Sequence, residues 1–389
     1  MKKVLLILLC IGVFILVFSP SIYAEEQIIE SIINKQLDLN NSEEIDRLLQ
    51  ELMAENEIYL GKDVKDIVLK LLRGEQILEN KNVMKSIKKI FINELSISLT
   101  LLSKVLIITI MSAILTNLQN SFEESSISQF ANYFAYMTIA ILIITNFSQI
   151  MKTTQLSVNR MINFMQILLP ILLTLMVLTG GPSSRMIFHP IILGSVNIMG
   201  TIIKNIIFPL IYFSFILNIL SNLSNRTELS KLSELGRKII IFIISAVFTI
   251  FIGILTIYGL STKMDGLTIR TAKFAIDSFL PIVGGFLSDS IDAVIGSSAI
   301  LKNGIGIVGL IILVMIILIP LIKITVLLLI YSITAAIIEP IASKNIVEFF
   351  GNTSKTLLLI LISMVAIGIM FFITITVVVD TSNNLLMLR

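Results

Sequence analysis

The segment from Thr256 to Leu310 has the sequence TIYGLSTKMDGLTIRTAKFAIDSFLPIVGGFLSDSIDAVIGSSAILKNGIGIVGL. It lies between two long apolar runs, yet it contains eight charged residues and eight glycines. Charged side chains are costly inside a bilayer and mark functional sites there, and glycine-interrupted segments between spans are typical of binding sites in transporters. The sequence therefore indicates a membrane protein whose functional region lies in the polar, glycine-rich segment 261–303.

The composition of the whole chain supports this interpretation. Of its 389 residues, 56% are hydrophobic and only 14% are charged, which does not fit a soluble protein. Several apolar runs have the length of about 20 residues that a membrane helix needs, so we expect an all-α, polytopic integral membrane protein. The net charge of +3 is not gathered into a basic stripe, which argues against nucleic acid as a partner.

The N-terminus has the features of a signal peptide. Lys2 and Lys3 precede an apolar run over residues 4–18, and the small residue Ala24 is followed by two glutamates. The sequence predicts a signal peptide over 1–24, with an uncleaved signal anchor as the alternative, and both place residues 25–98 outside the cytoplasm. Cys10 is the only cysteine of the chain, so removal of the signal would leave no thiol for disulfide, metal or nucleophilic chemistry.

Residues 25–98 are predicted to form a small helical segment outside the membrane. Asn41 and Glu44 have the spacing of a capping box, and apolar residues follow at helical intervals after it. A second helix with one apolar face is predicted to end at Gly74. The two apolar stripes could form a docking surface for a partner, or the two helices could pack on each other.

Residues 99–389 are predicted to form the membrane domain. The predicted single spans are 99–118, 131–151, 162–180, 239–260 and 356–379. The runs 187–220 and 304–340 are too long for one untilted span, since 34 residues of helix measure about 51 Å. Divided at Lys204-Asn205 and at Lys323, they bring the expected count to nine spans, with seven or eight as alternatives.

The loop 221–238 is the most basic short loop of the chain, because it carries Arg226, Lys231, Arg237 and Lys238. Positive charge is retained on the cytoplasmic side, so we expect this loop to be cytoplasmic. With 25–98 on the other side, an odd number of spans must precede the loop.

The membrane domain also contains a predicted internal duplication, with repeat units at about 127–221 and 238–332. Pro170 and Pro281 lie 111 positions apart in matching Leu-Pro-Ile contexts, and Pro209 and Pro320 repeat the same offset in matching Pro-Leu-Ile contexts. These four prolines are also candidate helix kinks.

The second unit differs from the first around residues 278–300. Gly284, Gly285 and Asp289 replace Leu173, Thr174 and Leu178 of the first unit. Polar or irregular backbone at membrane depth occurs only where protein or water surrounds it. We therefore expect 278–300 to be either a loop helix on the outer surface or a re-entrant element that faces an aqueous path.

The candidate path-lining or partner-contacting residues come from this part of the chain: Arg270, Lys273, Asp277, Gly284, Gly285, Asp289, Asp292 and Lys302. Lys273 and Asp277 share a helix face, and so do Asp289 and Asp292, but solvated surface pairs would have the same spacing. The single histidine, His189, lacks nearby carboxylates, and no hydrolase or phosphate-binding motif is present. We expect no catalytic residues, no metal site and no cofactor.

Several short motifs of the chain together resemble the stage III sporulation protein AE family. They are Lys-Met-Asp-Gly at 263–266, Arg-Thr-Ala-Lys at 270–273, Phe-Leu-Pro-Ile-Val-Gly-Gly at 279–285, Leu-Lys-Asn-Gly-Ile-Gly at 301–306 and Arg-Gly-Glu at 73–75. The resemblance implies a non-enzymatic component of the secretion-like complex that joins the mother cell to the forespore and sustains late forespore development. It implies a location in the mother-cell membrane around the forespore.

The implied partners are the other stage III sporulation A-operon proteins and, directly or indirectly, stage II sporulation protein Q, with homo-oligomers also possible. The alternative interpretation of the residues is a stand-alone secondary transporter with duplicated halves. Such a transporter should have glycine-interrupted short spans in both halves, whereas only the second half has one.

Overall fold

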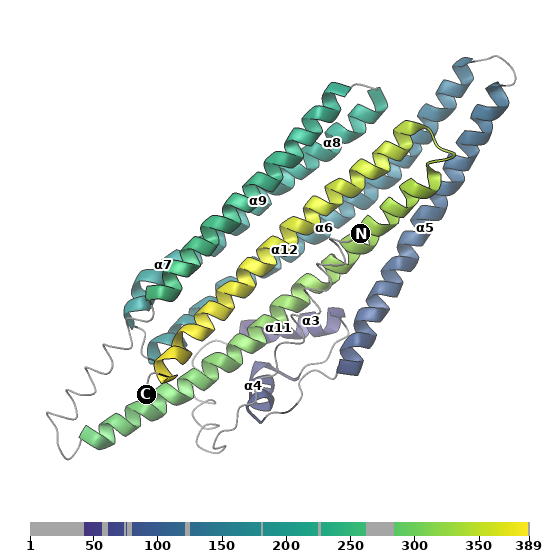
Figure 1. Ribbon diagram of the computed structural model, residues 1–389. Helices are drawn as coiled ribbons and strands as arrows, with labels where there is room; N and C mark the ends of the chain where they lie inside the picture. The colour runs from purple at the N-terminus through teal and green to yellow at the C-terminus, as the bar shows by residue number, and fades with distance from the viewer. Residues whose placement is uncertain are drawn as a thin grey trace.

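The computed structural model describes the backbone of residues 43–56, 61–73, 75, 80–120, 125–179, 182–224, 227–261 and 284–387 (Figure 1). Every regular element in these residues is a helix, so the predicted all-α class is confirmed. The predicted signal peptide, Asn41, Gly74 and most of the segment 261–283 lie outside the described residues.

Six long helical segments form an elongated bundle, in which neighbours in sequence run in opposite directions (Figure 1). They are α5 (Asn80–Asn120), α6 (Ser125–Leu178), the continuous run of α7 (Pro182–Ile202), η1 (Ile203–Ile207) and α8 (Phe208–Ser224), then α9 (Thr227–Ser261), α11 (Gly284–Ile338) and α12 (Lys344–Met387). Each contains an apolar stretch long enough to cross a bilayer. The chain is therefore a multi-pass membrane protein.

The prediction of nine separate spans is wrong for the described part of the chain, which contains six. Three predicted pairs are each one continuous helical segment: 131–151 with 162–180 in α6, the two halves of 187–220 in α7 to α8, and the two halves of 304–340 in α11. The polar residues at the expected divisions interrupt hydropathy but not helix formation, because Lys, Gln and Arg are good helix formers. Three helical segments still precede the loop 221–238, which is again an odd number.

The predicted division at Lys204-Asn205 coincides with a local change of helix type. Residues Ile203–Ile207 form a turn of π-helix, and Pro209 follows directly after it. Proline lacks the backbone N–H that would bond to the carbonyl four residues earlier, and such positions are accommodated by local changes in helix winding. The chain thus adapts at Pro209 without leaving the helix.

The hairpin of α11 and α12 forms the centre of the bundle. In their most apolar windows 61% of the residues are buried, compared with 28% in α5 and in α9. The exposed side chains of α9 are large and apolar, with Phe242 73% exposed and Ile250 61% exposed. Since such side chains suit lipid rather than water, α9 is an outer helix that faces the bilayer.

The two short helices α3 (Glu43–Asn56) and α4 (Val64–Leu72) lie against the side of α11. Their apolar stripes are buried there, including Leu49 of α3 and Val68 of α4. The stripes are therefore covered mainly by this chain's own long helices. The predicted partner-docking surface is not open on these stripes. The alternative, that the two helices pack on each other, accounts for part of their contacts, and the rest are with α11 and α6.

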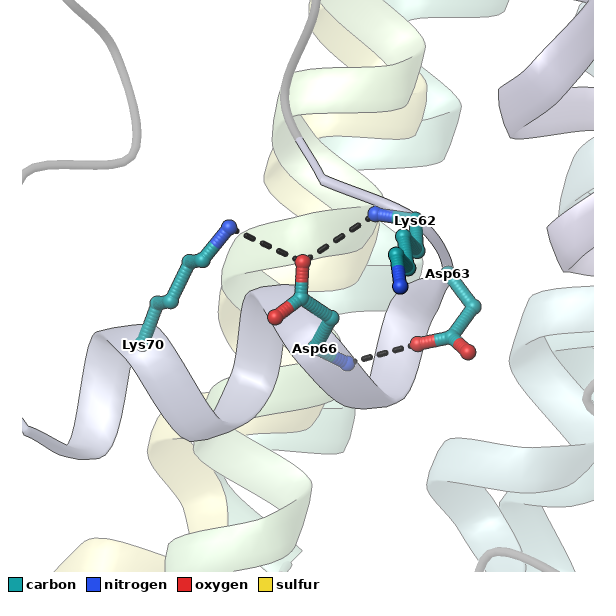
Figure 2. A network of polar contacts seen from close by, with 4 residues as sticks. All are labelled: Lys62, Asp63, Asp66 and Lys70. Atoms are coloured by element: carbon teal, nitrogen blue, oxygen red, sulfur yellow. Dashed lines mark hydrogen bonds and ion pairs between the residues drawn. The ribbon is translucent and has the colours of Figure 1, made fainter.

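Acidic side chains hold the start of α4 in place. Asp63 is its N-cap and accepts from the Asp66 amide at 2.7 Å, while Asp46 of α3 accepts from the Val64 amide at 2.6 Å. Figure 2 shows that Asp66 in turn accepts from the Lys62 amide at 3.1 Å and from the Lys70 ammonium at 2.9 Å. Because charged side chains are costly in the hydrocarbon core, we expect α4 to lie outside it.

Candidate functional site

The predicted site residues that the structure describes lie in the first part of α11. Arg270, Lys273, Asp277 and Pro281 lie outside the described residues. Gly284, Gly285, Asp289 and Asp292 lie in the first turns of α11, where the backbone is helical. The part of 278–300 that the structure describes is thus continuous with a long bundle helix, so the expectation of a separate loop helix or a re-entrant element is wrong for 284–300.

Lys302 is the predicted site residue whose side-chain surroundings the structure describes. Its side chain is completely buried, and its ammonium donates to the carbonyl oxygen of Val378 at 3.3 Å. The contact joins α11 to α12 near the end of the apolar run 356–379. Lys302 therefore lies within the helix interface, and the described residues do not place it on an open path.

Three glycines of α11 allow three different elements to approach this helix closely. A Cβ atom would lie 2.8 Å from Val68 of α4 at Gly304, and 2.6 Å from Leu168 of α6 at Gly309. At Gly306 it would clash with Val379 of α12. The glycine-rich sequence of 301–310 therefore serves close packing on three sides of α11.

Of the four candidate kinks, three lie inside described helices. Pro170 lies in α6, Pro209 lies in α8 directly after η1, and Pro320 lies in α11. Pro209 is the one next to a change of helix type.

Contacts between helices fix the relative depth of α6 and α12. At one end, the Tyr136 ring of α6 lies 5.3 Å from the Phe349 ring of α12. At the other end, Leu168 packs on Gly309 of α11, close to where α11 meets Val379 of α12. The part of α6 between these contacts therefore lies beside the run 356–379 of α12. That run contains no charged residue and is about 36 Å long, as a membrane span should be.

Beside the uncharged run 356–379 of α12, helix α6 has a polar outer face. Its exposed residues follow one another at intervals of three or four and so share one side of the helix. They are Lys152, Leu156, Arg160, Asn163 and Gln166. Two of the five are cations and two are amides, whereas α9 exposes phenylalanine and isoleucine at the same depth.

The polar face continues onto the neighbouring helix. The Gln166 amide of α6 donates to the side-chain oxygen of Asn197 on α7, and Gly200 of α7 packs on Ile162. Beyond Asn197, the exposed polar residues on this side are Thr201, Lys204 and Asn205. We call the exposed residues Lys152, Arg160, Asn163, Gln166, Asn197, Thr201, Lys204 and Asn205 the α6–α7 polar face.

The charge of the α6–α7 polar face is of one sign. It contains three basic residues and no acidic ones, and the sequence has no Asp or Glu anywhere between residues 125 and 224. Charged residues at membrane depth normally face protein or a water-filled cavity. In the single chain this face is exposed, so it needs water or another protein beside it.

The sequence contained a signal for this face. Residues 125–224 include no Asp or Glu, yet they carry basic residues within apolar runs. Hydropathy alone assigns Lys152, Arg160 and Lys204 to short connections between spans. The shared helix face becomes visible only when α6 and α7 are seen to continue through these positions.

The described residues give no other centre of chemistry. They contain no group of three His, Cys, Asp or Glu side chains placed to hold a metal ion. Several buried Ser and Thr hydroxyls donate to the carbonyl four residues earlier in the same helix, as Thr353 does to Phe349.

Comparisons with known proteins give the family. The profile of the family described as "Stage III sporulation protein AE" matches residues 62–382. The chain is also similar to "Stage III sporulation protein AE" of Bacillus subtilis (strain 168), with 32% identity over 349 residues, which cover 90% of this chain and 88% of the relative. No solved structure matches. Since both matches cover most of the chain, the protein belongs to the stage III sporulation protein AE family.

Proposed function

We propose that the chain is a non-enzymatic membrane subunit of the channel or secretion-like complex that links the mother cell to the forespore, and that its α6–α7 polar face lines the aqueous path of that complex. Family membership supports a role at stage III of sporulation. The specific observation behind the path is the exposed basic face at the depth of the uncharged run 356–379.

The two sides of the bundle have different chemistry. One side presents α9, with the exposed apolar residues Phe242 and Ile250. The α6–α7 polar face presents Lys152, Arg160 and Lys204 at a comparable depth. A chain surrounded by lipid on all sides would have to desolvate these three cations, at a cost of about 2.5–3.5 kcal/mol each on insertion scales. Association with other subunits around a water-filled path avoids that cost.

The proposed setting is the mother-cell membrane that surrounds the forespore. The proposed partners are the other stage III sporulation A-operon proteins and, directly or indirectly, stage II sporulation protein Q. Residues 25–98 would face the space between the two membranes. The proposed contacts with partners or the path are made by Arg270, Lys273, Asp277, Asp289 and Asp292, whereas Lys302 is buried between α11 and α12.

Cysteine labelling in sporulating cells tests the path. In a Cys10→Ser background, Asn163→Cys reports on the polar face, and Ile250→Cys on α9 is the matched control at a similar depth. A membrane-impermeant, charged thiol reagent should label the Asn163→Cys protein and leave the Ile250→Cys protein unlabelled, because thiolates form and react in water. Equal labelling of both positions, or of neither, would contradict an aqueous path beside α6.

A functional variant complements the labelling. Arg160→Glu reverses one charge of the face, and Ile250→Glu places a carboxylate on the exposed surface of α9 as a control for the cost of adding a negative charge. We compare spore counts at matched membrane abundance. Arg160→Glu should lower the count although the protein is inserted, and a normal count would remove the α6–α7 polar face from the proposed path.

A further inference from the structure

Helices α9 and α12 lie side by side and run in the same direction (Figure 1). A groove lies between them. The groove has a volume of about 390 Å³. Its walls are mostly apolar, with Ile244 and Phe248 on α9 and Leu361, Val365 and Ile369 on α12, and Ser245 and Thr249 of α9 are its polar lining residues. Ile369 is 44% exposed, so the groove is open to the outside of the bundle.

A basic residue lies between the same two helices, two turns above the groove. Arg237 of α9 faces Asn352 of α12, and one guanidinium nitrogen lies 3.4 Å from the Asn352 side-chain oxygen. The same nitrogen lies 3.5 Å from the hydroxyl oxygen of Ser233. Both distances are longer than the 2.7–3.2 Å of ordinary N–H···O hydrogen bonds. Arg237 is therefore only weakly engaged by its protein neighbours.

Other donors at this end are buried without a partner. The Nε atom of Arg237 has no hydrogen-bond partner among the described residues, and the same is true of the Ser214 hydroxyl and the Asn218 side-chain nitrogen on adjacent α8. Ser214 is fully buried and Asn218 is 2% exposed. Buried polar groups are normally paired, so unpaired donors on two adjacent helices indicate a missing acceptor.

The surrounding charge favours an anion as that acceptor. Lys238 neighbours Arg237 in the chain, and Lys355 of α12 is close enough to act on Glu234. Glu234 is the acidic residue of this group, and it is already paired with Lys238 at 3.1 Å. Glu234 also acts electrostatically on Arg237, but it is exposed and its ion pair is with Lys238.

The distance from Arg237 to the far end of the groove matches one leaflet of a bilayer. From Arg237 to Thr249, the last lining residue of α9, the helix rises about 18 Å. The hydrocarbon of one leaflet is about 15 Å thick, half of the bilayer core. In both helices the uncharged run begins directly below this point, after Lys238 and after Lys355. The guanidinium is therefore at headgroup depth, and the groove reaches toward the middle of the membrane.

We propose that Arg237 and the groove between α9 and α12 form a binding site for an anionic glycerophospholipid. The phosphate accepts from the guanidinium, which suits paired hydrogen bonds to phosphate oxygens, and one acyl chain lies along Phe248 and Val365. A second protein's membrane helix would need a groove through both leaflets, whereas this one ends at Thr249 and Ile369. The site faces away from the α6–α7 polar face and does not depend on the proposed path.

The absence of tryptophan from the chain permits a direct test. Phe248→Trp places a single fluorophore in the groove, and Phe242→Trp places one on the exposed surface of the same helix. Each full-length protein is reconstituted into mixed vesicles of phosphatidylcholine and brominated phosphatidylglycerol, and quenching by the brominated chains gives the relative affinity for the anionic lipid.

In the Phe248→Trp protein, phosphatidylglycerol should bind about fivefold more tightly than phosphatidylcholine, as expected from about 1 kcal/mol for one basic residue at the headgroup. In the Phe242→Trp protein the ratio should be about one, because that surface meets bulk lipid. Adding Arg237→Gln should bring the groove ratio to about one, and adding Lys238→Gln should leave it unchanged. Quenching in the Arg237→Gln, Phe242→Trp protein confirms that the variant is inserted.

Three results would overturn the site. The first is equal affinity for phosphatidylglycerol and phosphatidylcholine in the Phe248→Trp protein. The second is the same preference for phosphatidylglycerol at positions 248 and 242. The third is a preference for phosphatidylglycerol in the groove that persists with Arg237→Gln. Competition by millimolar glycerol phosphate would also contradict the proposal, because it would show that the headgroup alone occupies the site and that the groove does not bind the chain.

Discussion

Lys302 of α11 and Val378 of α12 are joined by a hydrogen bond across a buried helix interface, with the lysine ammonium 3.3 Å from the carbonyl oxygen. No part of the Lys302 side chain is exposed. The contact ties the predicted functional segment to the C-terminal end of the central hairpin. It also links the two helices near the level at which α4 packs on Gly304.

Two substitutions at Lys302 should therefore differ strongly. Lys302→Met keeps the length of the side chain and should change the stability by less than about 1.5 kcal/mol, as volume-conserving core changes do. Lys302→Glu places a carboxylate against a carbonyl oxygen and near Asp380, and should cost about 3–5 kcal/mol. Thermal unfolding of the purified proteins in detergent measures both. Similar unfolding temperatures for the two variants would contradict a tightly enclosed cation.

The close approach at Gly306 gives a second prediction. Gly306→Ala introduces a Cβ that clashes with Val379, so it should destabilise the hairpin of α11 and α12 by about 1–3 kcal/mol. Gly296 on the same helix has nothing within 4 Å of its Cβ position. Gly296→Ala should therefore be neutral or stabilising, by up to about 1 kcal/mol, because alanine is the better helix former. If the unfolding temperature falls equally in both variants, the destabilisation comes from the loss of glycine itself and not from a clash with Val379.

The start of α4 should depend on pH. The hydrogen bond from Lys70 holds the pKa of Asp66 below its ordinary value of 3.8, although partial burial opposes this shift. A depressed pKa means that the stabilisation is complete above the ordinary value and is lost as the pH falls below it. Because Asp66 is 33% exposed, the contribution should be below about 1 kcal/mol.

Asp66→Asn is the matched variant for this pH dependence. Its stability should be lower than that of the natural chain at pH 6, and the difference should shrink as the pH falls below about 4. Limited proteolysis of the segment containing α3 and α4 provides the measurement. A difference that grows on acidification would show that the Asp66 carboxylate does not stabilise α4.

The helical class and the outer spans could be predicted from the sequence because they depend on local pattern. The predicted spans 239–260 and 356–379 lie wholly within α9 and α12, since their apolar runs are bounded by charge. The division of α6 was wrong for a physical reason. The residues from Lys152 to Met161 are polar but contain no glycine or proline, so low hydropathy there reflects the environment of the face and not a break in the helix.

The packing of α4 on α11 could not be predicted in the same way. The contact of Val68 with Gly304 joins residues 236 positions apart, and neither residue carries a local signal for the other. The predicted site has the same limit, because Lys302 looks like an isolated charge in the sequence and is satisfied by a backbone carbonyl of a distant helix. The duplication at 127–221 and 238–332 stays a prediction.

The sidedness of the bundle also remains a prediction, and the structure sharpens its test. Three helical segments separate Glu51 of α3 from Ser230 at the start of α9, so the two residues should lie on opposite sides of the membrane. In a Cys10→Ser background, Glu51→Cys should react with a membrane-impermeant thiol reagent from outside, and Ser230→Cys should react only after the membrane is opened. Reaction of both from the same side would contradict the count of three crossings.

The last prediction concerns the first two turns of α11, where Gly285 and Asp289 lie. If these residues serve partners or the path, replacing them should remove function without unfolding the chain. Gly285→Leu replaces a poor helix former in a helical backbone and should be neutral or stabilising, by up to about 1 kcal/mol, wherever space permits. Asp289→Leu restores the residue found at the matching position of the first repeat unit. Both variants should therefore accumulate in the membrane at normal abundance, yet give fewer spores. Normal spore counts in both would show that the start of α11 is only a structural extension of the bundle, and reduced abundance in both would show that the two positions are needed for folding and not for partner or path contacts.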